Sequence, residues 1–90
     1  MKIKDLEFRE TKPCFDDVLY TTHTELGRIT VLDRLTGYSG KIRDIETGFC
    51  DKEDLFWLAS GMFDIRNYPD LTIEEAIQKI KDNANICKGI

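Results

Sequence analysis

Residues 29–49 read ITVLDRLTGYSGKIRDIETGF, and this stretch decides the fold that the sequence predicts. Its first four residues, Ile29 to Leu32, are rich in β-branched side chains, which favour a strand. Residues 18–22 (VLYTT) form a second run of the same kind, and residues 25–28, between the two runs, are typical of a turn. The two runs therefore predict an antiparallel hairpin.

The same stretch contains the motif Asp-x-x-Thr-Gly-aromatic twice, at residues 33–38 and 44–49. Aspartate accepts hydrogen bonds from nearby backbone amides and glycine adopts left-handed conformations, so we interpret each copy as a turn whose aromatic residue enters the core. For the region up to Gly48, the sequence is compatible with either a short extended segment or an Ω-like loop. The alternative is a ligand or cation site formed by oxygens of Asp33, Thr36, Asp44 and Thr47.

Two further strands are predicted at Phe49-Cys50 and at residues 55–59 (LFWLA), around the polar turn 51–54. We expect most aromatic side chains of residues 56–66 to lie in the core. Alternation along a strand places Phe56 and Trp57 on opposite faces. Since one helix covers only one face, one of these two rings faces outward or is covered by a loop.

The C-terminal region predicts a helix from about Ile73 to Asn83. Thr72 and Glu75 have the spacing of a capping box, in which each side chain satisfies the backbone amide of the other residue. Leu71 and Ala76 are placed for a hydrophobic staple. An apolar stripe with helical spacing follows, formed by Ile73, Ala76, Ile77, Ile80 and Ala84.

The first ten residues have no clear period and predict a short strand or an irregular arm, which ends at residues 11–13. Together these patterns predict a single small α+β domain over residues 1–90. Its antiparallel sheet has three to five strands, and the C-terminal helix packs on one face, because neither element buries its apolar side alone.

The composition excludes several classes of protein. With 41% hydrophobic and 33% charged residues the chain is too apolar to be intrinsically disordered. A net charge of −4 makes direct nucleic-acid binding unlikely, and the interleaved charges argue only weakly for nucleic-acid mimicry. No apolar run is long enough for a membrane span and the N-terminus lacks a signal-like stretch, so we expect a cytoplasmic protein with reduced cysteines.

No pattern of residues predicts catalysis, a metal or a cofactor. Cys14, His23, Cys50 and Cys87 are too widely spaced for a typical zinc site. The acidic residues 51–54 are expected in a solvated turn, and the chain has neither a nucleophile motif nor a phosphate-binding loop. We therefore expect a protein that is not an enzyme.

The remaining hypothesis is a protein-binding surface centred on residues 34–54. Arginine, tyrosine and tryptophan are over-represented at interfaces, and Trp57 is the expected anchor. The predicted contact residues are Arg34, Tyr38, Arg43, Asp44, Glu46, Trp57 and Arg66.

A resemblance adds to this interpretation. Residues 43–49 (RDIETGF) and 56–66 (FWLASGMFDIR), with the helix at 71–77 (LTIEEAI), resemble small uncharacterised accessory proteins of tailed bacteriophages. The resemblance implies a protein that binds a host protein in the host cytoplasm, such as a defence nuclease, an RNA polymerase subunit or a regulator, as an inhibitor or modulator. We expect a monomer or a homodimer. A small-ligand or metal-binding domain and a nucleic-acid mimic or binder are the alternatives.

Overall fold

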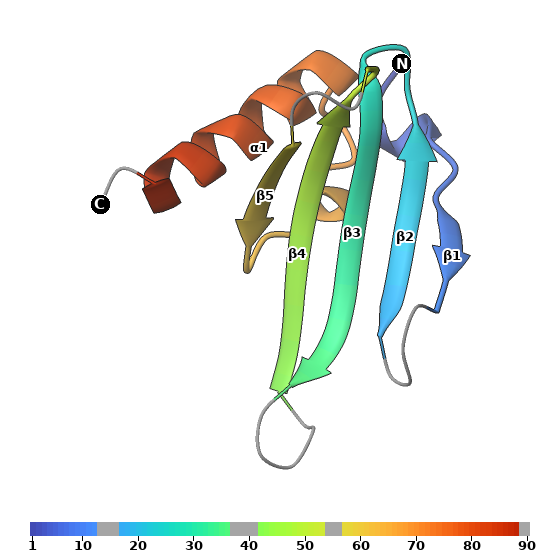
Figure 1. Cartoon of the computed structure of the whole chain (residues 1–90). Helices are drawn as coiled ribbons and strands as arrows, with labels where there is room; N and C mark the ends of the chain where they lie inside the picture. The colour runs from blue at the N-terminus through green and yellow to red at the C-terminus, as the bar shows by residue number, and fades with distance from the viewer. Residues whose placement is uncertain (13–16, 37–41, 54–56, 89–90) are drawn as a thin grey trace.

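Five antiparallel strands form one sheet in which each strand pairs with its neighbour in the chain (Figure 1). The computed structural model describes residues 1–12, 17–36, 42–53 and 57–88, and the elements are those of these residues. The strands are β1 (Arg9–Thr11), β2 (Val18–His23), β3 (Gly27–Thr36), β4 (Ile42–Asp51) and β5 (Trp57–Gly61). The helices are the 3-10 turns η1 (Ile3–Asp5) and η2 (Ile65–Asn67) and the helix α1 (Ile73–Lys88). The predicted α+β class, with an antiparallel sheet and a C-terminal helix, is confirmed.

The pairing of β3 with β4 dominates the sheet. All ten residues of β3 pair with residues of β4, from Gly27 opposite Asp51 to Thr36 opposite Ile42. Both strands continue past β5 and past the part of the sheet that α1 covers (Figure 1). The hairpin predicted upstream is also present, because β2 pairs with β3 along its whole length.

The core lies between one face of the sheet and α1. Alternation directs Ile29 and Val31 of β3 and Phe49 of β4 to the same side, where all three are buried. The helix contributes the predicted apolar stripe, and each of its five members is buried: Ile73, Ala76, Ile77, Ile80 and Ala84. Phe63 and Ile65 from the segment before α1 complete this core.

The start of α1 has the predicted capping box. The Thr72 amide donates to the Glu75 carboxylate at 3.0 Å, and the Glu75 amide donates to the Thr72 hydroxyl at 3.2 Å. The hydrogen bond that the Glu75 carboxylate accepts from the Thr72 amide, followed by hydrogen bonding with the Thr72 side chain, lowers the pKa of this exposed carboxyl below its ordinary value. The helix ends at Lys88, beyond the predicted Asn83.

The interpretation of the second Asp-x-x-Thr-Gly-aromatic motif as a turn is wrong. Residues 44–49 lie within β4, where Gly48 pairs with Thr30 on one side and with Ala59 on the other. Ile45, Thr47 and Phe49 alternate toward the core, and the intervening glycine hid this period in the sequence. Of the first motif, residues 33–36 lie in β3 and residues 37–38 lie outside the described residues.

The region between the two motifs is also more regular than an Ω-like loop. β3 continues to Thr36 and β4 begins at Ile42, so strand conformation accounts for the described residues 35–36 and 42–48. Cross-strand pairing along the hairpin outweighs the local turn preference of Thr-Gly.

The N-terminal residues are anchored to the entry of α1. The Ile3 amide donates to the Leu71 carbonyl at 2.9 Å, and the Lys4 amide donates to the Pro69 carbonyl at 3.0 Å. Ile3 is buried in the core, and β1 then adds three residues to the edge of the sheet. The predicted arm is therefore partly helical and partly strand.

Candidate functional site

Among the described elements, no helix or strand covers the face of the sheet opposite α1 (Figure 1). In β3 the core positions Ile29 and Val31 alternate with Arg28, Thr30 and Leu32, which lie on this opposite side. We call this surface the open face. Its described side chains are Arg9, Thr11, Leu19, Thr21, His23, Arg28, Thr30, Leu32, Arg34, Asp44, Glu46, Cys50 and Ala59.

The open face is hollowed near β2 and β3. A depression of about 490 Å³ extends from Arg9 and Thr11 on β1 to Glu46 on β4. Leu19 and Leu32 pair directly across β2 and β3 and are half-buried on its floor. Such a floor of aliphatic and hydroxyl groups, bordered by charges, has the mixed character of a protein-binding surface.

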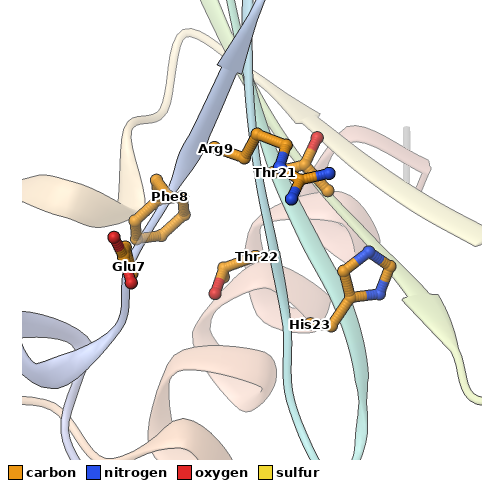
Figure 2. A pocket seen from close by; sticks show the side chains of 6 residues that line it. All are labelled: Glu7, Phe8, Arg9, Thr21, Thr22 and His23. Carbon is orange, nitrogen blue, oxygen red and sulfur yellow. The ribbon is translucent and has the colours of Figure 1, made fainter.

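A second hollow of about 430 Å³ lies where the chain before β1 separates from β2 (Figure 2). It shares Arg9, Thr21 and His23 with the first hollow and adds Glu7, Phe8 and Thr22. Figure 2 shows Thr21 and His23 on one side of β2 and Thr22 on the other. The two hollows therefore meet around the short edge strand β1.

The predicted contacts Arg34 and Asp44 face each other across β3 and β4 on the open face. The Arg34 guanidinium donates from Nε and Nη2 to one carboxylate oxygen of Asp44, at 3.1 and 2.9 Å. This hydrogen bonding and the charge of Asp44 raise the pKa of Arg34 above its ordinary value. Glu46 lies on the same face, opposite Leu32, so the structure brings Arg34, Asp44 and Glu46 together.

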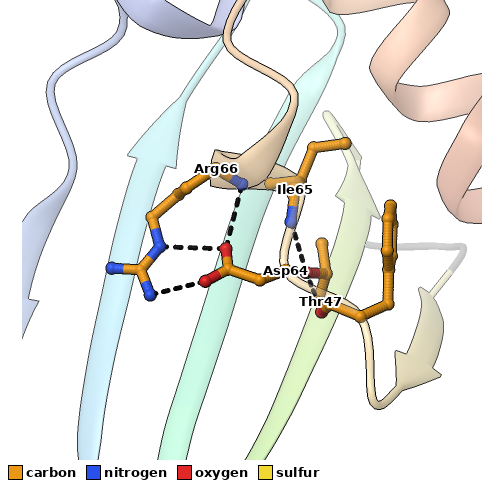
Figure 3. Close-up of polar contacts among 5 residues, drawn as sticks. Thr47, Asp64, Ile65 and Arg66 are labelled. Atoms are coloured by element: carbon orange, nitrogen blue, oxygen red, sulfur yellow. Dashed lines mark hydrogen bonds and ion pairs between the residues drawn. The ribbon is translucent and has the colours of Figure 1, made fainter.

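The predicted contact Arg66 lies on the other side of the sheet. Its Nη2 donates to Asp64 Oδ2 at 2.8 Å (Figure 3). Its guanidinium carbon lies 4.3 Å from the ring centroid of Tyr20, which packs against the core. Burial acts to raise the pKa of Asp64, but the hydrogen bonds from the Arg66 side chain and amide outweigh it, so the pKa is lowered. Arg66 therefore does not share a surface with Arg34.

Three predicted contact residues are described in part or not at all. Tyr38 lies outside the described residues, and for Arg43 and Trp57 the structure describes the strand position alone. Arg43 pairs with Leu35, and Trp57 pairs with Cys50 at the end of β5.

The two Asp-x-x-Thr-Gly copies do not direct their described side chains to one pocket. Asp33 pairs with Ile45 on the core side and is buried, whereas Asp44 lies on the open face. Thr47 is fully buried and is hydrogen-bonded to backbone groups of Phe63 and Ile65 (Figure 3). The geometry therefore places Asp44 on the opposite face of the sheet from Asp33 and Thr47, so these three side chains do not converge on one pocket as the ligand hypothesis required.

No group of three His, Cys, Asp or Glu residues within the described ranges could hold a metal ion. His23 and Cys50 are separated by β3, because both pair with its residue Arg28. The side chains of Cys14 and Cys87 lie outside the part of the chain that the structure describes. In the predicted acidic turn at residues 51–54, Asp51 is the last residue of β4, and Lys52 and Glu53 are exposed. Asp54 lies outside the described residues.

The predicted contact residues include none from β1 or β2, which form half of the open face. Arg9, Thr21 and His23 were not predicted as contacts, although they line both hollows. The pattern is present in residues 28–32, where Arg, Thr and Leu alternate with the apolar core positions Ile29 and Val31. Extending that alternation across the predicted hairpin would have placed Thr21 and His23 on the same face.

The fold and this surface define a small α+β domain with one covered and one open sheet face. No protein-family model, curated protein or solved structure matches the chain. Among the described residues, α1 and the two 3-10 turns include no segment that is both long and apolar enough to cross a membrane.

Proposed function

We propose that the protein is a non-catalytic protein-binding module whose partner docks on the open face. The observation that carries this proposal is the uncovered sheet face with its hollow of about 490 Å³ over Leu19 and Leu32. A sheet in a small domain normally buries apolar residues on its packed face and exposes polar residues on the other. A paired, half-buried leucine floor on the uncovered side is the feature that a partner would cover.

The charged side chains around this floor support a protein partner. Arg34 and Asp44 hold each other in place at one end of the face, which fixes their geometry before any partner binds. Preorganised side chains lose less conformational entropy on association. Glu46 borders the hollow itself.

The resemblance to phage accessory proteins supports a more specific form of the proposal. The partner is then a host protein, and the domain acts in the host cytoplasm as an inhibitor or modulator of defence or transcription. The proposal includes neither a cofactor nor a chemical step, and it includes neither a membrane nor direct binding to nucleic acid.

The test is capture of a bacterial protein from lysate by the immobilised domain, with matched variants. Leu32→Lys places a charge on the hollow floor opposite Glu46, which can pair with it across the strands and so preserve the sheet. Gln78→Lys adds the same charge at an exposed position of α1. We expect Leu32→Lys to weaken capture at least about tenfold, as loss of an interface hot spot does, and Gln78→Lys to leave it unchanged.

The proposal fails if the wild-type domain captures nothing. It also fails if a folded Leu32→Lys variant captures the same protein as well as the wild type does. Circular dichroism and melting curves of both variants establish that each is folded before capture is compared.

A further inference from the structure

We propose that the outer edge of β5 pairs with the same edge of a second copy of the chain, in antiparallel register about Ala59. β5 is the last strand of the sheet, and among the described residues no strand lies beyond it (Figure 1). An edge strand presents a row of backbone donors and acceptors that can pair with a strand of another chain. The inference goes beyond the proposed function, because pairing between copies requires no other protein.

The two edges of the sheet differ in the features that prevent such pairing. At the other edge, β1 has only three residues, all exposed, and two of them are the charged Arg9 and Glu10. Lys12 and Pro13 follow directly in the sequence. Short length, charge and proline are common protections of an edge strand. β5, at Trp57–Gly61, has five residues and includes neither a charged residue nor a proline, so it lacks these protections.

The sequence of β5 is compatible with pairing to itself. A two-fold axis between the two Ala59 residues places Leu58 of each copy opposite Ser60 of the other. Leu58 and Ser60 occupy core-side positions of the sheet, and both are buried. Trp57 and Gly61, which alternate with them, are opposed in the same way. Like charges directly opposite each other would oppose this pairing, and β5 has no charged residue.

The residue that follows β5 gives a second reason to expect a contact at this edge. Met62 has the most exposed large apolar side chain among the described residues, at 85%. Its backbone φ of 60° is rare for a residue other than glycine. In the proposed register the end of each β5 lies beside the start of β5 in the other copy, so pairing brings Met62 next to the second chain.

Pairing at this edge would join the open faces of the two copies. A two-fold axis normal to the sheet keeps both open faces on one side and both α1 helices on the other. Thr30, Gly48 and Ala59 form a row of small residues across β3, β4 and β5. This row would continue directly into the same row of the other copy. The dimer would therefore present a single open face of twice the width.

The test is sedimentation equilibrium of the purified domain with charged variants of Ala59. This residue is half-buried on the open face, so a longer side chain there does not enter the core. We expect the wild type to dimerise with a micromolar dissociation constant, consistent with a small interface. Ala59→Lys and Ala59→Glu should each weaken dimerisation at least about tenfold, because each places like charges directly opposite each other.

An equimolar mixture of the two charged variants separates loss of pairing from loss of folding. Opposite charges then face each other, so heterodimers should form with an affinity within about threefold of the wild type. A variant that only misfolds would not be rescued by mixing. Thr11→Lys is the matched control, because it adds the same charge at the exposed β1 edge and should leave dimerisation unchanged.

The proposal is overturned if the wild type remains monomeric up to about 1 mM. It is overturned equally if either Ala59 variant dimerises as tightly as the wild type, or if the mixture does not regain dimerisation. A dimer that dissociates in Thr11→Lys would assign the contact to β1 instead. Because these measurements use the purified domain, their failure is distinguishable from failure of partner capture in lysate.

Discussion

Thr47 joins two parts of the chain that are distant in sequence. Its hydroxyl donates to the Phe63 carbonyl at 2.6 Å and accepts from the Ile65 amide at 3.1 Å, and the residue is fully buried. The segment after β5 is thereby fixed against β4 before α1 begins. This role follows from the position of Thr47 in a strand and not from a turn.

Thr47→Val should therefore destabilise the domain by about 3 kcal/mol, because it leaves a buried carbonyl and a buried amide without partners. The measurement is urea unfolding followed by circular dichroism. Thr47→Ser is the control, since it keeps the hydroxyl and loses one methyl group, which is worth about 1 kcal/mol. A Thr47→Val variant as stable as Thr47→Ser would contradict this role.

Gly27 begins β3 with a φ of 149° and lies against the neighbouring strand. A β-carbon at this position would lie 2.8 Å from Phe49 Cε1 and would also overlap the Cys50 carbonyl oxygen. Since a backbone atom cannot move aside without shifting β4, Gly27→Ala should lower the free energy of unfolding by more than about 2 kcal/mol. Gly61→Ala is the control, because its β-carbon meets no atom within 4 Å. Equal melting temperatures for the two variants would contradict the prediction.

The ion pair between Asp64 and Arg66 should make the stability of the folded domain depend on pH. The pKa of Asp64 in the folded protein is lowered from its ordinary value of 3.8, so the folded state favours the ionised form. The resulting stabilisation is complete above pH 3.8 and is lost as the pH falls through the lower folded pKa. Asp64→Asn keeps an acceptor for the Arg66 amide but cannot titrate.

Unfolding measured across this acidic range should show a steeper loss of stability for the wild type than for Asp64→Asn. Arg66→Gln should flatten the same part of the profile, because it removes the group that favours the ionised carboxylate. Parallel profiles for the wild type and both variants would show that the pair does not contribute.

At the scale of the element, α1 is the part of the fold that the sequence predicts most completely. The capping box and the apolar stripe are both local patterns, and the structure contains both. The strand β4 was harder to predict because its conformation depends on β3 and β5 on either side. Gly48 in the middle of β4 is unfavourable for a strand in isolation and is held there by pairing with Thr30 and Ala59.

The open face was only partly predictable, because it too is formed by pairing between strands that are distant in sequence. Arg34, Asp44 and Glu46 lie close in sequence to the motif that drew attention to them. His23 joins the face through the predicted hairpin of β2 with β3. Arg9 joins it through the register of β1 with β2, which local sequence patterns do not encode. Arg66 is a predicted contact because arginine is common at interfaces, but the segment after β5 takes its side chain to the core side, against Tyr20.

The capping box at the start of α1 should contribute to the stability of the domain. Thr72→Ala removes the hydroxyl that accepts from the Glu75 amide and should destabilise the domain by about 1 kcal/mol. Thr72→Ser keeps the cap and should remain within a few tenths of a kcal/mol of the wild type. Thermal unfolding of the two variants measures the difference, and equal stabilities would show that the cap contributes nothing.

For the whole molecule, the two faces of the sheet differ in what covers them and in composition. One face carries the core and receives α1, and Thr47 fixes the connecting segment there. The opposite face carries a leucine floor, hydroxyl groups and opposed charges without a covering element among the described residues. Under the proposed function, stability depends on the core-facing residues and partner binding on the alternate residues of the same strands. We therefore expect substitutions on the open face to alter binding without removing core contacts.

The most direct test of this account is site-specific photo-cross-linking in bacterial lysate. A photoreactive residue is placed at Leu32 on the open face and, in a matched protein, at Gln78 on the exposed side of α1. We expect one discrete cross-linked partner from position 32 and none from position 78. Cross-linking to the same protein from position 78 alone, or no adduct from position 32, would contradict the claim that the open face binds the partner.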